Sequence, residues 1–160
     1  MSDIKTENIE KEDIYKLILD IWDNHVPFHK VINQKVIKLD TDSCEIGLTK
    51  TQDLVIDNVT KRLHGGVIAS ILHNTGALLA IINFIEYFES KDRNYIIKQS
   101  EKAGTLDLNI QYLRPGIGEK FLCIGSVVRR SKRLVVAKME LKNQTGNMVA
   151  MATGKYMIKD

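Results

Sequence analysis

The residues best suited to chemistry stand at the start of one apolar segment. His64, Gly65 and Gly66 open a stretch that stays almost wholly apolar to Phe84, and His73 is the first ionisable side chain inside it. Glycine has no Cβ, so a ligand can approach the backbone N–H groups of the pair closely. A helix N-terminus adds unpaired N–H donors and partial positive charge, which suit a carbonyl oxygen or an oxyanion. A flexible turn before a core helix is the alternative explanation.

The spacing of Gly65 and His73 bears on assembly. The two residues are eight positions apart, which on one helix corresponds to about 12 Å at about 1.5 Å per residue. That separation is too large for both to reach one carbonyl carbon. A two-fold axis that sets two such helices antiparallel brings Gly65 of one subunit against His73 of the other. The spacing therefore predicts a homodimer with two equivalent sites between its subunits.

The segment that carries both residues is predicted to form a buried central helix. Its apolar side chains leave no polar face, so protein should surround it on every side. Its length approaches that of a membrane span. Five polar residues interrupt it, namely Ser70, His73, Asn74, Thr75 and Asn83. We therefore expect a core helix and no membrane span.

The elements before and after this helix follow from local patterns. Helical spacing over residues 13–22 predicts an amphipathic helix, and Pro27 ends that pattern. Two short strands are predicted at residues 31–39 and 44–48, followed by a loop at 51–63. Residues 86–103 are predicted to extend the central helix briefly and then to cross over as a long polar connection.

The C-terminal part changes to a two-residue period. Polar and apolar residues alternate from Thr105 to Tyr112, which predicts a strand with one buried face. Three more strands are predicted at hairpin spacing, at residues 121–129, 134–141 and 148–158. Strands that wrap the apolar helix would bury both the helix and the apolar faces of the strands. We therefore expect an α+β fold with an antiparallel sheet around a long central helix. Residues 1–160 fit one domain with an N-terminal helix.

The distribution of charge along the chain bears on which ligands the protein could bind. The net charge is +3, and residues 114–160 hold 10 Lys and Arg against 3 Asp and Glu. Four of these basic residues flank Ser131, namely Arg129, Arg130, Lys132 and Arg133. The cluster suits the phosphates of a ligand, although a solvated hairpin tip has the same composition. No basic helix, zinc finger or aromatic platform accompanies it, so nucleic acid is not an expected partner.

The two cysteines and the composition of the N-terminal residues indicate the cellular compartment in which the protein is expected. Cys44 and Cys123 form neither a disulfide framework nor a metal-binding spacing, so we expect no metal and a reducing cytoplasm. The acidic N-terminal residues lack an early apolar run, and we expect no secretory signal.

Three segments together resemble hotdog-fold thioesterases of the PaaI type. They are HGGVIAS at residues 64–70, TLDLNIQYLRPG at 105–116 and AMATGKY at 150–156. The similarity covers most of the chain from His25 onward. The polar connection after the helix and residues 104–116 are most similar to the YigI-like medium- and long-chain acyl-CoA thioesterases. The resemblance implies a hotdog fold, no cofactor, hydrolysis of acyl-CoA to fatty acid and CoA, and a homodimer or a dimer of dimers.

The resemblance also implies roles for single residues. Gly65 takes the place of the glycine whose N–H polarises the thioester carbonyl, and His64 that of the histidine before it. Asn58 corresponds to an asparagine that helps hold the reacting groups. Thr105 corresponds to a hydroxyl near the attacking water. The turn that contacts CoA phosphates falls at Lys132 and Arg133, and Gly66 and Arg114 are further expected substrate-binding residues.

His73 is where the chain departs from this family. It stands at the position of the catalytic Asp or Glu. One reading makes His73 a replacement general base, since neutral imidazole accepts protons near neutral pH. A second reading is that activity is lost and the chain binds acyl-CoA or an acyl carrier protein without catalysis. A third is that another carboxylate, such as Asp107 or Asp57, has taken over.

Overall fold

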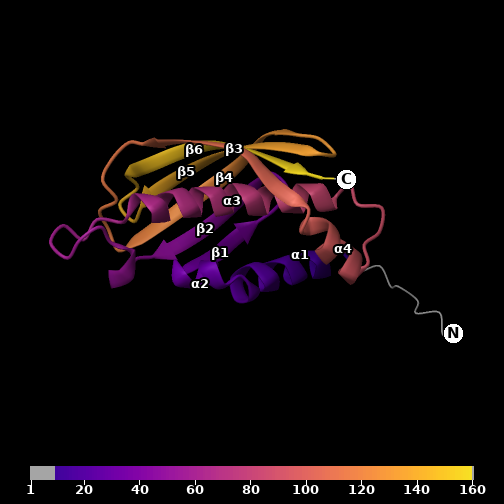
Figure 1. Cartoon of the computed structure of the whole chain (residues 1–160), viewed down its shortest axis with the longest axis horizontal. Coiled ribbons are helices and arrows are strands. Elements are labelled where there is room, and N and C mark those ends of the chain that lie inside the picture. Colours follow the sequence, from indigo (N-terminus) through magenta and orange to yellow (C-terminus); the bar gives the residue numbers. More distant parts are fainter. Residues whose placement is uncertain (1–9, 160) are drawn as a thin grey trace.

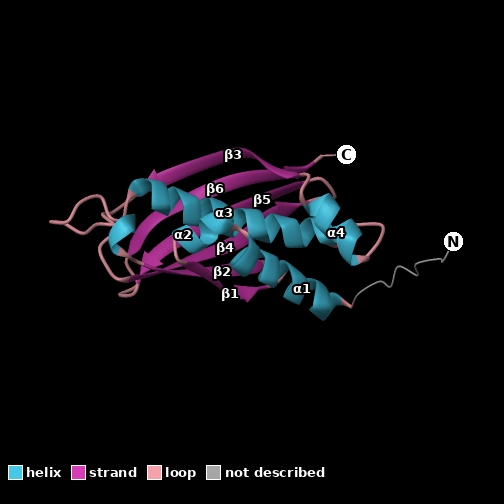
Figure 2. Ribbon diagram, turned by 60° about the horizontal axis from the view of Figure 1, so that its bottom comes forward, coloured by secondary structure: helices cyan, strands magenta, loops and turns pink. Residues whose placement is uncertain are grey.

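A six-stranded antiparallel sheet wraps one long helix, α3 (Gly65–Ile85), in the computed structural model, which describes residues 10–159 (Figures 1 and 2). The order of the strands across the sheet is β1-β2-β4-β5-β6-β3. Their bounds are β1 Gln34–Leu39, β2 Ser43–Thr49, β3 Ala103–Tyr112, β4 Lys120–Arg130, β5 Leu134–Asn143 and β6 Met148–Ile158. The predicted fold class is therefore confirmed.

Helix α3 is the centre of the hydrophobic core. It contacts β2, β4, β5 and β6, and side chains such as Leu72, Leu78 and Leu79 are fully buried against them. By length and composition α3 is the one described helix that could cross a membrane, yet 72% of its most apolar window is buried inside the protein. The sheet and the shorter helices supply the apolar surroundings that the sequence of this helix requires.

The N-terminal layer is more helical than its sequence pattern predicts. The predicted helix appears as α1 (Lys11–Asp20), and a π-helical turn, η1 (Ile21–His25), continues it. Pro27 does not end the helical region, because it opens a further helix, α2 (Pro27–Val31). Proline is well tolerated at a first helical position, where its missing N–H would have no intrahelical acceptor. The predicted strand over 31–39 accordingly begins later, at Gln34.

Residues 86–103 were predicted as a long connection, and this prediction is wrong for their second half. Helix α4 (Arg93–Ser100) forms there. The side chain of Asp92 caps it by accepting hydrogen bonds from the backbone N–H groups of Asn94 and Tyr95, both at 3.0 Å. Buried Ile96 anchors the helix to the core. The loop over 51–63 is confirmed, with a short 3-10 turn, η2 (Gln52–Leu54), inside it.

Strand β3 differs from the expected strand with one buried face. It lies at the edge of the sheet and pairs only with β6 among the described strands. Leu106 is 57% exposed and Tyr112 is 55% exposed, while Leu108 and Ile110 are only partly buried. A register shift between Thr105 and Asp107 marks a β-bulge. One side of β3 is thus an open, partly apolar edge.

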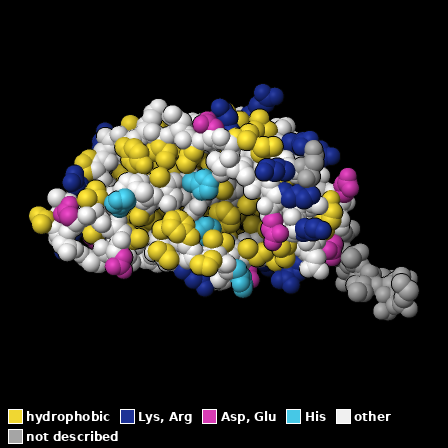
Figure 3. Space-filling model, in the orientation of Figure 1, with side chains coloured by type: hydrophobic (Ala, Val, Ile, Leu, Met, Phe, Trp, Pro, Cys, Tyr) yellow, Lys and Arg dark blue, Asp and Glu magenta, His cyan; other side chains and the backbone are white. Residues whose placement is uncertain are grey.

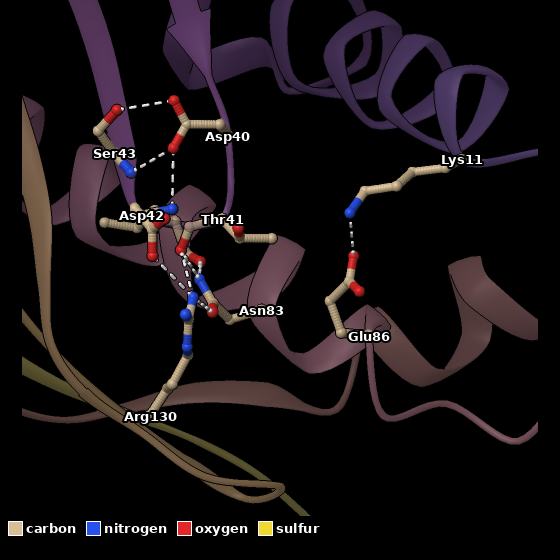
Figure 4. Close-up of polar contacts among 9 residues, drawn as sticks. Lys11, Asp40, Thr41, Asp42, Ser43, Asn83, Glu86 and Arg130 are labelled. Carbon is tan, nitrogen blue, oxygen red and sulfur yellow. Dashed lines mark hydrogen bonds and ion pairs between the residues drawn. The ribbon is translucent and has the colours of Figure 1, made fainter.

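Arg130 joins three elements at one end of α3 (Figure 4). Its guanidinium donates to the Thr41 carbonyl at 3.1 Å and to Asn83 Oδ1 at 3.2 Å, and it pairs with Asp42 at 3.0 Å. Buried Asn83 itself donates to the Thr41 carbonyl at 2.9 Å. Arg130 therefore fastens the β1–β2 turn to α3, which sets it apart from its basic neighbours in the sequence.

Replacing Gly76 with alanine is expected to destabilise the protein. Gly76 lies on α3 against buried Tyr156, and an added Cβ would come within 2.7 Å of the Tyr156 Cζ. Alanine gains about 1 kcal/mol in helix propensity over glycine, but overpacking a rigid core costs about 1–3 kcal/mol. We expect a net loss of about 1 kcal/mol, measured by urea unfolding.

Gly104→Ala is the matched control, because a Cβ added at Gly104 meets nothing within 4 Å. Its unfolding midpoint should stay close to that of the wild type. A more stable Gly76→Ala protein would contradict the packing argument.

Candidate active site

His73 and Thr105 meet where α3 passes the start of β3. His73 Nε2 lies 2.8 Å from Thr105 Oγ1. The histidine is partly buried and the threonine is exposed, so the contact lies where a ligand can reach it. The structure thus brings together two of the residues singled out in the sequence, although they are 32 positions apart.

Two amides behind His73 fix the orientation of its ring. Buried Asn74 donates from Nδ2 to Gln34 Oε1 at 3.0 Å, so its Oδ1 is the atom that faces His73. His73 Nδ1 lies 3.3 Å from this oxygen, an acceptor that matches a proton on Nδ1. In that tautomer Nε2 carries the lone pair and accepts the Thr105 hydroxyl. The sequence analysis gave Asn74 and Gln34 no role in the site, since only the packing of β1 against α3 brings them together.

A second histidine, His29, lies close enough to His73 to interact with it electrostatically. His29 is 5% exposed and donates from Nδ1 to the Trp22 carbonyl at 2.8 Å. Burial lowers the pKa of His29 below its ordinary value. The surroundings of His29 therefore favour its neutral form. His29 lies on α2, a helix that the sequence pattern did not predict.

The backbone N–H groups of Gly65 and Gly66, at the start of α3, differ in whether they are already hydrogen-bonded. His64 caps the helix, because its Nδ1 accepts the N–H of Gly66 at 3.0 Å. The N–H of Gly65 has no acceptor among residues 10–159. Of the two predicted donors, Gly65 is the one available to a ligand, and Gly66 serves the cap.

Gly65 opens onto a cavity of about 340 Å³. Tyr112 and Arg114 share its lining with Gly65. The Tyr112 hydroxyl donates to the Gly65 carbonyl at 3.1 Å, and Arg114 donates to the Met148 carbonyl at 3.0 Å. An added Cβ at Gly65 would lie 3.7 Å from the Tyr112 ring, an ordinary contact. The protein fold alone therefore does not require glycine at this position.

The remaining predicted residues lie outside these contacts. Asn58 is exposed on the loop before α3 and hydrogen-bonds Gln52. Asp57 accepts hydrogen bonds from the Thr60 hydroxyl and backbone, which lower the pKa of its carboxyl group. Asp107 pairs with Lys155 at 3.2 Å. Within the described chain none of the three hydrogen-bonds His73, so the two carboxylates have other partners.

Lys132 and Arg133 lie in the β4–β5 turn, as the hairpin prediction requires. They line a cavity of about 310 Å³ together with Lys102 and the aromatic rings of Tyr87 and Tyr95. Positive charge and aromatic faces thus meet at the end of the sheet where β3 begins. This combination suits a phosphorylated ligand that carries a planar ring.

The site consists of two halves spread along one edge strand. Thr105, near the start of β3, meets His73, and Tyr112, at its end, meets Gly65. Histidine side chains lie among hydrophobic ones on the face of the molecule seen in Figure 3. No group of three or more His, Cys, Asp or Glu residues suited to a metal ion occurs in the part of the chain that the structure describes.

Comparison with known proteins agrees with this geometry. The model of the thioesterase superfamily matches residues 61–150. The chain is 30% identical to the medium/long-chain acyl-CoA thioesterase YigI of Escherichia coli K12, over 92% of this chain and 95% of that protein.

Two solved structures share the fold. A thioesterase-superfamily protein of Shewanella oneidensis has a TM-score of 0.86 at 31% identity, over 96% of this chain and 100% of that one. The PaaI protein of the E. coli phenylacetic acid degradation operon has a TM-score of 0.71 at 18% identity, over 93% and 95% of the two chains. The family model matches more than half of the chain, and the 30% identity extends over 92% of it. Together with the shared hotdog fold, these findings show that this chain belongs to the thioesterase superfamily.

Proposed function

We propose that this protein is an acyl-CoA thioesterase that hydrolyses medium- or long-chain acyl-CoA to fatty acid and CoA. The observation that carries the proposal is the contact between His73 Nε2 and Thr105, with Asn74 behind the ring. An imidazole nitrogen that accepts a hydrogen bond from a hydroxyl is the arrangement of a general base. The similarity to YigI supports the substrate class.

The Gly65 N–H supplies the second requirement of thioester hydrolysis. Negative charge develops on the carbonyl oxygen when the carbon is attacked, and a preorganised N–H donor stabilises it by about 3–4 kcal/mol. Gly65 has this donor free at a helix N-terminus. His73 accepts the proton lost during the attack and returns one to the leaving thiolate.

The two halves of the site come together in a dimer formed through β3. An antiparallel pair of β3 strands, with its two-fold axis between Leu108 and Asn109, sets Thr105 of one chain opposite Tyr112 of the other. His73 then faces Gly65 of the partner subunit. The open edge of β3 and its exposed apolar side chains support this assembly.

Light scattering at micromolar concentration is expected to give a mass about twice the 18.2 kDa of one chain, or four times that mass if two dimers associate. The reason is that each site needs groups from two chains. A particle with the mass of a single chain that hydrolyses acyl-CoA would contradict the shared site.

The acyl chain has an apolar path from His73. Ala77 and Ile81 follow His73 at four-residue intervals on the same partly exposed side of α3. Ile81 borders a cavity of about 190 Å³ whose lining also includes Trp22 of η1 and Ile97 of α4. We assign the acyl chain to this path and the CoA nucleotide to the cavity beside Lys132 and Arg133.

The assigned path predicts a chain-length threshold. Eight residues of α3 rise about 12 Å, and an extended alkyl chain advances about 1.25 Å per carbon. The sole tryptophan, Trp22, should therefore change its fluorescence only with acyl chains of about ten carbons or more. The measurement titrates the protein with acyl-CoAs from acetyl to palmitoyl.

Ile81→Phe fills the cavity and should shift preference toward shorter chains. Ile37→Phe is the matched control, because Ile37 is 63% exposed on β1 and lies outside the cavity lining. An equal response of Trp22 to acetyl- and palmitoyl-CoA would refute the path.

Release of free CoA from purified protein tests the proposed function as a whole. Turnover of decanoyl- or palmitoyl-CoA supports it. Tight binding of these thioesters without turnover would instead identify a non-catalytic acyl-CoA or acyl-carrier-protein binding protein. We further propose a cytoplasmic location, which is supported by the unpaired, buried thiols of Cys44 and Cys123.

A further inference from the structure

The hydrogen bonds around His73 match those of a nucleophile, base and orienting group. Thr105 Oγ1 lies 2.8 Å from Nε2, and Asn74 Oδ1 lies 3.3 Å from Nδ1. Nucleophilic hydrolases place a hydroxyl or thiol, a histidine and an Asp or Asn in this order. A carboxylate base could hold a water on one oxygen while its other oxygen contacts the threonine. Neutral imidazole offers one lone pair, and the Thr105 hydroxyl occupies it.

We propose that Thr105 is the nucleophile of this enzyme and that hydrolysis passes through an acyl ester on its Oγ1. This inference rests on the proposed thioesterase function and deepens it. His73 is the base that activates Thr105, and Asn74 is a positioning residue that holds the histidine ring.

The reaction balances in two steps. Thr105 Oγ1 attacks the thioester carbon while its proton passes to His73 Nε2; the C–S bond then breaks, and the imidazolium gives that proton to the CoA thiolate. In the second step a water attacks the ester carbon and loses its proton to Nε2. The C–O bond to Thr105 breaks, the proton returns to Oγ1, and the fatty acid leaves.

The surroundings of Thr105 suit an attacking group. The residue is exposed at the β-bulge between Thr105 and Asp107, and bulges next to active sites re-aim side chains. Gly104 before it leaves open space, since an added Cβ there meets nothing within 4 Å. A thioester bound between the two subunits can therefore approach Oγ1 from the side away from His73.

The test looks for the covalent adduct directly. The protein is mixed with decanoyl-CoA, quenched in acid within milliseconds and digested. The mass of the peptide that contains Thr105 is then measured by mass spectrometry. A second sample is treated with an alkyl fluorophosphonate, which loses fluoride to an activated hydroxyl and forms an ester that water does not readily remove. We expect the hydroxyl at position 105 to carry an acyl or phosphonyl group in the wild type and in Thr105→Ser.

Thr105→Val keeps the shape of the side chain without the hydroxyl, so it should lose both adducts and lower turnover by about 10²-fold or more. Thr153→Val, on the exposed side of β6, is the matched control and should retain both. Acyl-CoA hydrolysis with neither adduct on wild-type Thr105 would overturn the assignment of Thr105 as the nucleophile, but not the proposed thioesterase function. Phosphonylated Thr105 without hydrolysis of any acyl-CoA would overturn the thioesterase function, although the Thr105 hydroxyl would still be activated.

Discussion

Gly65→Pro is expected to lower kcat by about 10²–10³-fold while the protein stays folded. Proline removes the N–H that is assigned to the thioester oxyanion, and loss of one such donor costs about 2.7–4 kcal/mol in other hydrolases. Gly65 is the first residue of α3, and its N–H has no acceptor within residues 10–159. Proline is favoured at that helical position, and His64 before it already has the extended backbone that proline requires. Steady-state hydrolysis of decanoyl-CoA measures the loss.

Gly65→Ala separates the donor from the side chain. It adds a Cβ at an ordinary 3.7 Å from the Tyr112 ring and keeps the N–H, so its kcat should fall far less than that of Gly65→Pro. Unfolding midpoints of both variants should match the wild type. Equal activity of Gly65→Pro and Gly65→Ala would exclude this N–H from the reaction.

His73→Gln is expected to lower turnover by about 10²-fold or more, with little change in acyl-CoA binding. Glutamine can still hydrogen-bond Thr105 but cannot accept a proton, and a general base contributes about 10²–10⁴-fold. Steady-state hydrolysis of decanoyl-CoA by wild type, His73→Gln and His73→Asp gives the comparison.

His73→Asp restores a carboxylate at this position and should retain more activity than His73→Gln, because a carboxylate can accept a proton. Full activity of His73→Gln would remove the histidine from the mechanism. Mixing Gly65→Pro with His73→Gln chains adds a check on the shared site. About half of the dimers should then be mixed, each with one intact site, and about a quarter of wild-type activity should return.

The sequence predicted the central helix and the β-hairpins well, because their apolar patterns are strong and local. All six strands are found, and β6 (Met148–Ile158) has the predicted bounds. Helix α4 was missed because its apolar residues, Tyr95, Ile96 and Ile97, are consecutive and show no helical spacing, and only Ile96 is buried. The Asp92 cap was a readable signal for its start.

The sequence named some of the residues that the structure brings together. His73 and Thr105 were both candidates, and they are in contact, while their catalytic roles stay predictions. Asn74 and Gln34 were not predicted as parts of the site, because an amide that orients a catalytic ring has the same sequence signature as a buried core amide. Long-range packing of β1 on α3 makes that distinction, and no spacing in the sequence records it.

The open edge of β3 has a consequence for the newly made chain. Its 10 residues present backbone donors and acceptors along one side, with Leu106 and Tyr112 exposed beside them. Such an edge binds any compatible strand, including that of a misfolded neighbour. During rapid overproduction, when partly folded chains are abundant, correct pairing competes with aggregation. Slower synthesis at lower temperature should therefore raise the soluble yield.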